Sequence, residues 1–250
     1  MYSRYVKTEA IVLNSVQFGE GHNIINLFTE SYGKVEASAF GVRKTKSRFG
    51  SKLEPFTISH FLLYHKSEDS LFTIKDVNVH FHNNSISEDF QKFIVGNSLI
   101  EPVILFVEKG QADRNLYRLL SDALKVLNEI ITNKSIYLLS MYDIKFLSIM
   151  GYSPNISMCK KCGDHLNDKE SYMDHYYGFP ICKRCKTGSS VQIYTGTLRF
   201  IEWVDTNSIA YSKKVTMEKP TLDNIRSVIE QLYLHTFHKK PQSWKQLNPY

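Results

Sequence analysis

Apolar and polar residues alternate through residues 1–83 in the manner of short β-strands. Turn signals, most of them glycines, separate the apolar runs. The connection between Phe40 and Phe56 is longer than the others. The predicted strands are Thr8–Val16, Asn23–Thr29, Val35–Phe40, Phe56–Tyr64 and Leu71–Val79.

From residue 86 onward the apolar positions follow the period of amphipathic helices. Ser87, followed by two acidic residues, predicts a helix start, and Pro102 predicts a kink or a second helix over 103–108. Asp113 predicts the cap of a long helix that reaches residue 131. Gly151 predicts the end of the next helix, 136–150. Two further helices are expected at 198–204 and 222–238.

The only four cysteines form two Cys-x-x-Cys pairs: Cys159, Cys162, Cys182 and Cys185. Residues 163–181 separate the pairs, within the window of roughly 15 to 20 residues that is typical of a four-thiolate zinc site. Four thiolates close the tetrahedral shell of Zn²⁺, so we expect a structural ion rather than a catalytic one. His165 or His175 in place of one cysteine, a redox pair and unmetallated thiols are the alternatives.

Together these patterns predict a multi-domain α+β protein. Five short strands with a long third connection fit a barrel of the oligonucleotide-binding (OB) type, although an SH3-like barrel or an open sheet has the same periodicity. We expect an OB-fold nucleic-acid-binding domain over 1–83 and a four-cysteine zinc module over 159–187. A helical domain is expected on both sides of that module, at 84–158 and 188–250.

The composition is that of a folded protein, with 42% hydrophobic and 22% charged residues. The net charge of +6 is compatible with nucleic acid or an acidic partner. No apolar run approaches the ~18 residues of a membrane span, and the start lacks a signal-peptide core. We therefore expect a soluble cytoplasmic protein that does not contact a membrane.

The long connection after the third predicted strand is strongly basic. Residues 41–50 carry four cations and no carboxylate: Arg43, Lys44, Lys46 and Arg48. Cations at this density neutralise successive phosphates, and Phe40 or Phe49 could stack on an unpaired base. A solvated surface loop is the alternative.

The sequence contains no Walker loop, nucleophile elbow, His-Glu-x-x-His motif or paired-carboxylate signature. His80 and His82, near a predicted strand end, are interpreted as surface histidines. We therefore expect no enzymatic activity. Two other classes remain open: an RNA-binding protein with an OB fold and a zinc ribbon, and a metal-dependent enzyme with an open coordination site.

Particular motifs resemble those of the RecO family of bacterial recombination mediators. The resemblance covers nearly the whole chain. It rests on Glu9-Ala10-Ile11-Val12-Leu13, Gly19-Glu20, Ile24, Leu27-Phe28-Thr29, Gly33-Lys34, Gly41-Val42-Arg43-Lys44, Lys46-Ser47-Arg48 and Leu53-Glu54-Pro55-Phe56. It continues with Phe146-Leu147, Gly151-Tyr152-x-Pro154, Cys159-x-x-Cys162-Gly163, His235, Lys239, Ser243-Trp244 and Leu247.

The resemblance implies a protein without turnover of its own in recombinational DNA repair. Such a protein binds single- and double-stranded DNA, anneals complementary strands, and helps RecR and the single-stranded-DNA-binding protein SSB to load RecA onto gaps. It implies that the four loop cations are the main phosphate contacts, with Lys34 and Lys52 as neighbours, and that the four cysteines hold Zn²⁺. It also implies nucleoid association during repair and an apolar groove with basic rims for the SSB tail. The chain departs from the family at His22, where Asp or Asn is expected, and in the slightly acidic segment 84–158.

Overall fold

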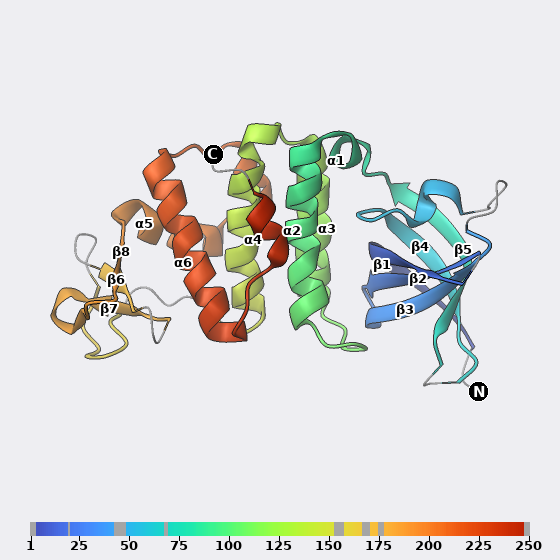
Figure 1. Cartoon of the computed structure of the whole chain (residues 1–250), viewed down its shortest axis with the longest axis horizontal. Helices are drawn as coiled ribbons and strands as arrows, with labels where there is room; N and C mark the ends of the chain where they lie inside the picture. Colours follow the sequence, from blue (N-terminus) through green and yellow to red (C-terminus); the bar gives the residue numbers. More distant parts are fainter. Residues whose placement is uncertain are drawn as a thin grey trace.

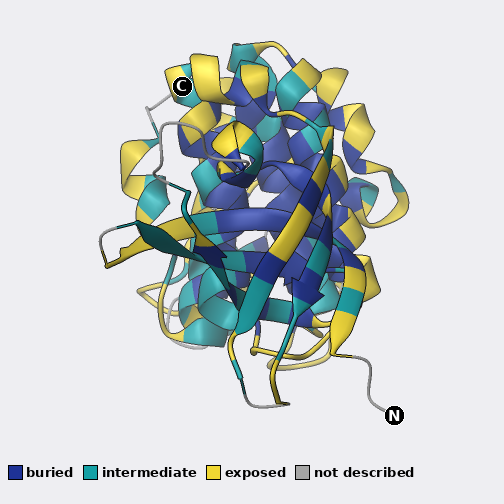
Figure 2. Ribbon diagram, turned by 90° about the vertical axis from the view of Figure 1, so that its right-hand side faces the viewer, coloured by how far each residue is buried: buried dark blue, intermediate teal, exposed yellow. Residues whose placement is uncertain are grey.

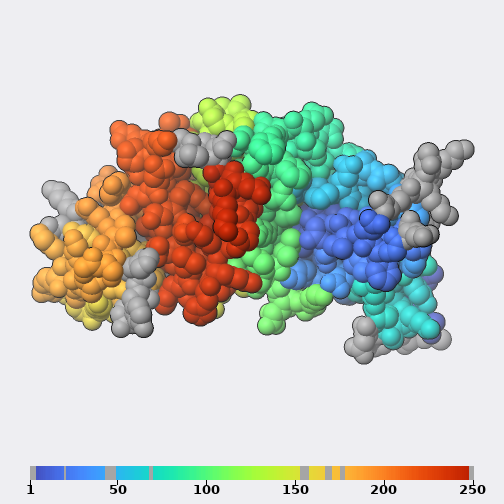
Figure 3. All heavy atoms as spheres, viewed as in Figure 1, coloured from blue at the N-terminus to red at the C-terminus, as the bar shows by residue number. Residues whose placement is uncertain are grey.

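The computed structural model describes residues 4–19, 21–42, 49–67, 70–152, 158–166, 171–174 and 178–247. The β-barrel lies at one end, the long helices lie in the middle, and the cysteine-containing module lies at the other end (Figure 1). The space-filling view shows the same order, with α6 (Lys219–Phe237) and the residues after it over the middle of this face (Figure 3).

The N-terminal strands close into a barrel in the order β1-β2-β3-β5-β4. β3 and β5 pair in parallel, and the other neighbours pair antiparallel. This closed five-stranded topology confirms the predicted OB-type barrel and excludes an open sheet. Each predicted run forms a strand; the fourth strand is shorter than predicted, and the other four are longer. The strands are β1 Tyr5–Phe18, β2 His22–Thr29, β3 Gly33–Phe40, β4 Ile58–Tyr64 and β5 Phe72–Phe81.

The barrel packs on the helices through one wall. In Figure 2 the barrel lies in front of the helices and is viewed from the side opposite this wall. In β1, Ala10 and Val12 point into the barrel, whereas Ile11 and Leu13 belong to the same hydrophobic cluster as the helices. Both faces of this strand are therefore buried, and its sequence is a continuous apolar run for that reason. Phe28 completes this interface by packing against Tyr117, with ring centroids 5.9 Å apart.

The helical domain confirms most of the expected helices and corrects two details. Asp113 caps α3 and Gly151 follows the end of α4, as predicted. The cap of α2 is Asp89 rather than Ser87, because a short helix, α1, precedes it and Asp89 Oδ1 accepts the Lys92 N–H at 3.0 Å. The helices are α1 Asn84–Glu88, α2 Phe90–Phe106, α3 Arg114–Glu129, α4 Ser135–Ile149, α5 Thr195–Thr206 and α6 Lys219–Phe237.

Pro102 neither ends α2 nor starts a new helix, so the prediction of a separate helix at 103–108 is wrong. Pro102 is buried in the helical core, where tertiary packing holds the helix together despite the lost backbone hydrogen bond. Within the residues described, no helix combines the length and the apolar character needed to cross a membrane.

A buried polar cluster joins α4 to α6 inside this core. The Asp143 carboxylate accepts a hydrogen bond from Arg226 Nη1 at 2.6 Å and one from the Tyr233 hydroxyl at 3.2 Å. The Arg226 guanidinium also lies over the ring of Trp244, 4.6 Å from its centroid. The C-terminal segment is therefore tied to the helical core by charge as well as by apolar contact.

Candidate nucleic-acid interface and metal centre

The four thiols of the cysteine module meet at one point, as predicted. All four sulfur atoms lie within 4.8 Å of one another, and the Cys162 and Cys182 sulfurs are 3.7 Å apart. A Zn–S bond of about 2.3 Å places the sulfurs of a tetrahedral site about 3.8 Å apart. The donors therefore fit a metal ion of this size. Among the described residues the group contains cysteines alone, and His175 lies outside those residues.

Two tight turns present these thiols. In the first turn the Gly163 N–H donates to the Cys159 carbonyl at 2.8 Å, and Gly163 adopts a φ of +77°, a conformation that glycine tolerates without strain. The second turn is the short 3₁₀-helix Lys183–Cys185. Three short strands support both turns: β6 Ser171–Met173, β7 Pro180–Cys182 and β8 Val191–Ile193.

Backbone donors favour the metal-binding form of Cys159. Burial opposes ionisation of this thiol, but the N–H groups of Cys182, Cys162 and Lys161 lower its pKa to about 6. A thiolate is the form that binds metal. An ion pair between Arg184 and Asp164 also joins the two turns across the site. Burial and the neighbouring thiols raise the pKa of Cys162 to about 12, and burial raises that of Cys185. The local electrostatics therefore favour the thiolate form of Cys159 but not of Cys162 or Cys185.

The basic connection begins beside a row of exposed rings. Arg43, Lys44, Lys46 and Arg48 lie outside the described residues. Phe18, His22 and Phe40 are cross-strand neighbours at one end of β1, β2 and β3. Phe18 is 63% exposed and Phe40 is 54% exposed, so both rings are available to a base. His22 Nδ1 accepts the Gly41 N–H at 3.4 Å, so this departure from the family pattern keeps a turn hydrogen bond.

Phe49 does not share that exposure. It is only 2% exposed and belongs to the hydrophobic cluster inside the barrel. The interpretation of Phe49 as a residue that stacks on a base is therefore wrong, because its ring closes the barrel core. Lys52 follows in the short 3₁₀-helix Gly50–Leu53, where its ammonium donates to the Val77 carbonyl at 3.5 Å.

Lys34 lies at the interface between the barrel and the helices. Its ammonium donates to the carbonyls of Val103 at 3.3 Å and Ile104 at 2.6 Å, at the C-terminal end of α2. Burial lowers the pKa of Lys34, Lys109 lowers it further, and Glu36 opposes the shift. These contacts make Lys34 an interface residue, and its role as a phosphate contact stays a prediction.

Comparison with known proteins identifies the family. The model of "Recombination protein O N terminal" matches residues 1–81, and that of "Recombination protein O C terminal" matches residues 87–245. The DNA repair protein RecO of Thermoanaerobacter sp. (strain X514) is 34% identical over 183 residues, which cover 73% of this chain and 72% of that protein. The RecO of Clostridium novyi (strain NT) is 25% identical over 242 residues, covering 97% of this chain and 93% of that protein.

The chain belongs to the RecO family. This RecO-family protein therefore has a role in DNA repair. Both the barrel and the helical domain with its cysteines fall within the matched regions.

The helical domain of this RecO-family protein carries an apolar groove of about 590 Å³ between α5, α6 and the intervening 3₁₀-helix Ile209–Lys213. Phe200, Trp203 and Tyr211 form its aromatic wall, and Arg199 and Lys214 line its edge. Among the described residues that line the groove there is no Asp or Glu. The acidic bias of residues 84–158 therefore does not extend to this groove. The family resemblance implies an apolar groove, but its residues could not be named from the sequence, because the walls of this groove come from segments that only the fold brings together.

Proposed function

We propose that this protein is a recombination mediator that binds single- and double-stranded DNA and anneals complementary strands. The observation that carries the proposal is the closed OB-type barrel of a RecO-family chain, with exposed aromatic rings at the strand ends from which the basic connection leaves. Cations reduce the repulsion between two phosphate backbones, and the rings offer stacking surfaces to unpaired bases. Neither step requires covalent chemistry, so we propose no catalytic turnover.

The proposed phosphate contacts are Arg43, Lys44, Lys46 and Arg48, with Lys52 and Lys34 as flanking positions. Lys34 is the weakest member of this set, because its ammonium already donates to two carbonyls. We further propose that RecR contacts the barrel and that RecA is loaded indirectly, at the nucleoid, onto gaps from which SSB is displaced.

Replacing the four loop cations by alanine is expected to abolish annealing of complementary oligonucleotides coated with the cognate SSB. Direct binding to single strands should also become less sensitive to salt. Each lost phosphate contact reduces the slope of log K against log salt by about 0.7, so the slope should fall by roughly 3. The measurement is annealing by fluorescence quenching, with affinities taken at several salt concentrations.

The matched control replaces four exposed cations near the opposite end of the barrel: Arg4, Lys7, Lys66 and Lys75. This control removes four positive charges, as the loop variant does. Equal losses of annealing and DNA affinity in both variants would contradict a local DNA site. Full annealing activity of the loop variant would place the DNA surface elsewhere. Tighter binding to RNA than to DNA of the same sequence would instead favour the RNA-binding alternative.

We propose that the groove lined by Trp203 binds the hydrophobic C-terminal tail of SSB. The aromatic wall suits an apolar side chain, and Arg199 and Lys214 suit the terminal carboxylate that every such tail carries. Trp203→Ala is expected to weaken binding of an SSB tail peptide by roughly 30-fold, the effect of removing a central aromatic anchor. Phe90→Ala removes an exposed ring of α2 outside the groove and should leave peptide affinity unchanged.

We propose Zn²⁺ as the ion of the four-cysteine centre. Four thiolates would fill the tetrahedral shell of Zn²⁺ and leave no position for a substrate, so the ion would hold the two turns together.

A further inference from the structure

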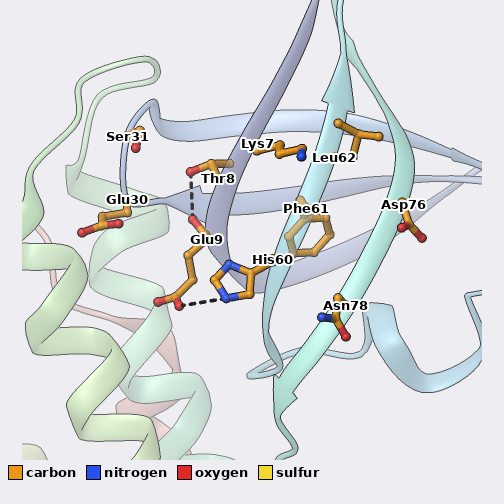
Figure 4. Close-up of a pocket in the computed structure, with 10 residues that line it drawn as sticks. All are labelled: Lys7, Thr8, Glu9, Glu30, Ser31, His60, Phe61, Leu62, Asp76 and Asn78. Atoms are coloured by element: carbon orange, nitrogen blue, oxygen red, sulfur yellow. Dashed lines mark hydrogen bonds and ion pairs between the residues drawn. The ribbon is translucent and has the colours of Figure 1, made fainter.

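A second group of potential metal ligands lies on the outer wall of the barrel. Glu9 on β1 is directly opposite His60 on β4, and Figure 4 shows these two side chains pointing toward each other. A register shift between β4 and β5 leaves His80 as an extra residue on β5, next to the same site. His80 is close to His82 in the sequence, but in the fold it lies beside His60 and Glu9.

The three donor atoms converge. His80 Nε2 lies 3.2 Å from Glu9 Oε2, and His60 Nε2 lies 4.0 Å from the same oxygen. All three donor atoms lie within 4.8 Å of one another. Ligand bonds of about 2.0–2.2 Å separate the donors of a tetrahedral ion by about 3.3–3.5 Å. Small side-chain adjustments would therefore bring all three donors to one ion.

A residue of the helical domain orients the carboxylate. The Tyr117 hydroxyl, from α3, donates to Glu9 Oε1 at 2.9 Å. With Oε1 occupied, Oε2 is the oxygen that faces the imidazoles. Hydrogen bonds of this kind hold metal-binding carboxylates in position.

We propose that Glu9, His60 and His80 bind a divalent transition-metal ion of the Zn²⁺ or Ni²⁺ type. Two imidazoles and one carboxylate form a donor set that suits these ions, and a fourth position remains open to water. The bound ion would connect β1, β4 and β5, and through Tyr117 it would couple the barrel to α3. This site is separate from the four-cysteine centre, which lies at the other end of the molecule (Figure 1).

Equilibrium dialysis of the full chain against Zn²⁺, with bound metal counted by atomic emission, tests the proposal. The wild type is expected to bind one equivalent at the cysteines and a second, weaker one at the barrel. The double variant His60→Ala, His80→Ala should keep only the first. Tyr117→Phe should weaken the second equivalent by about 10-fold or more, the usual effect of losing an outer hydrogen bond to a ligand.

His82→Ala and His165→Ala serve as matched controls, because each removes an exposed histidine outside the cluster. Both should retain the second equivalent. Co²⁺ provides an independent signature, since the second ion should add a spectrum without thiolate charge-transfer bands. One equivalent in the wild type, equal loss in His82→Ala, or retention of the second ion by the double variant would overturn the proposal. Circular dichroism with one equivalent of Zn²⁺, enough to fill only the cysteines, should give the wild-type spectrum for each variant and so confirm that it is folded.

Discussion

Removing cysteines of the proposed zinc centre is expected to unfold the cysteine module while leaving the barrel folded. Structural zinc supplies about 10–16 kcal/mol of binding free energy to small zinc-finger peptides, more than the short strands β6, β7 and β8 could replace. The variant Cys159→Ser, Cys182→Ser removes one thiol from each turn. Hydrogen exchange should then become fast between residues 158 and 193, and zinc content should fall to near zero.

The loss of stability is expected to extend to α6. Met173 and Ile193 are buried in the same hydrophobic cluster as the long helices. Asn224 on α6 donates to the Gln192 carbonyl at 2.9 Å and accepts the Tyr194 N–H at 2.9 Å. We therefore expect a lower melting temperature of the helical domain as well as local unfolding of the module.

Lys160→Ala is the matched control, because it changes a side chain in the first turn and keeps all four thiols. Its zinc content and hydrogen exchange should equal those of the wild type. A cysteine variant with wild-type exchange in the module would show that the fold of these turns does not depend on metal. In the Co²⁺-substituted wild type, a spectrum without bands from four thiolates would contradict the closed centre and reopen the enzyme alternative.

Asp143→Ala is expected to destabilise the helical domain by about 3–5 kcal/mol, the usual cost of breaking a buried ion pair from one side. The Asp143 side chain is fully buried and that of Arg226 is 16% exposed, and the alanine would leave the guanidinium without its carboxylate. The Tyr233 hydroxyl would lose its acceptor at the same time. Urea unfolding followed by circular dichroism measures the loss.

The exposed pair between Lys213 and Glu129 supplies the control. Glu129→Ala breaks an ion pair of similar length at the surface, where solvent screens the charges, and it should leave the urea midpoint unchanged. Similar losses of unfolding free energy in Asp143→Ala and Glu129→Ala would contradict the prediction that burial makes the Asp143 pair the more important of the two.

The Asp143 pair also predicts that the free energy of unfolding depends on pH. Burial raises the pKa of Asp143 from 3.8 to about 6, although Arg226 and Tyr233 oppose this shift. Between these values the folded chain holds a proton that the unfolded chain releases. The contribution of this group to the free energy of unfolding is therefore full below pH 3.8 and is lost as the pH rises through about 6. Asp143→Asn should remove that slope, so urea unfolding at several pH values should show the free energy of unfolding of the wild type falling relative to that of the variant between pH 3.8 and about 6.

The parts that sequence reasoning recovered depend on local signals. The five strands follow from alternation and turns, α3 follows from Asp113 and its apolar stripe, and the cysteine cluster follows from spacing. Two tight turns bring each pair of thiols together, so little long-range information is needed. The missed features have no local signature. In the sequence Phe49 looks like an exposed loop aromatic, and only the closed barrel buries its ring. Pro102 looks like a helix break, and only packing against neighbouring residues keeps α2 continuous.

By itself the sequence determined the order of the parts, the five strands of the barrel, the clustering of the four cysteines and the family. Tertiary structure alone decided which side chains from distant segments share a site. In the fold Glu9 lies beside His60, His80 and Tyr117. The Lys34 ammonium contacts the C-terminal end of α2, and the groove forms around Trp203. Periodicity reports which face of an element is buried, whereas strand register and helix packing decide what that face meets.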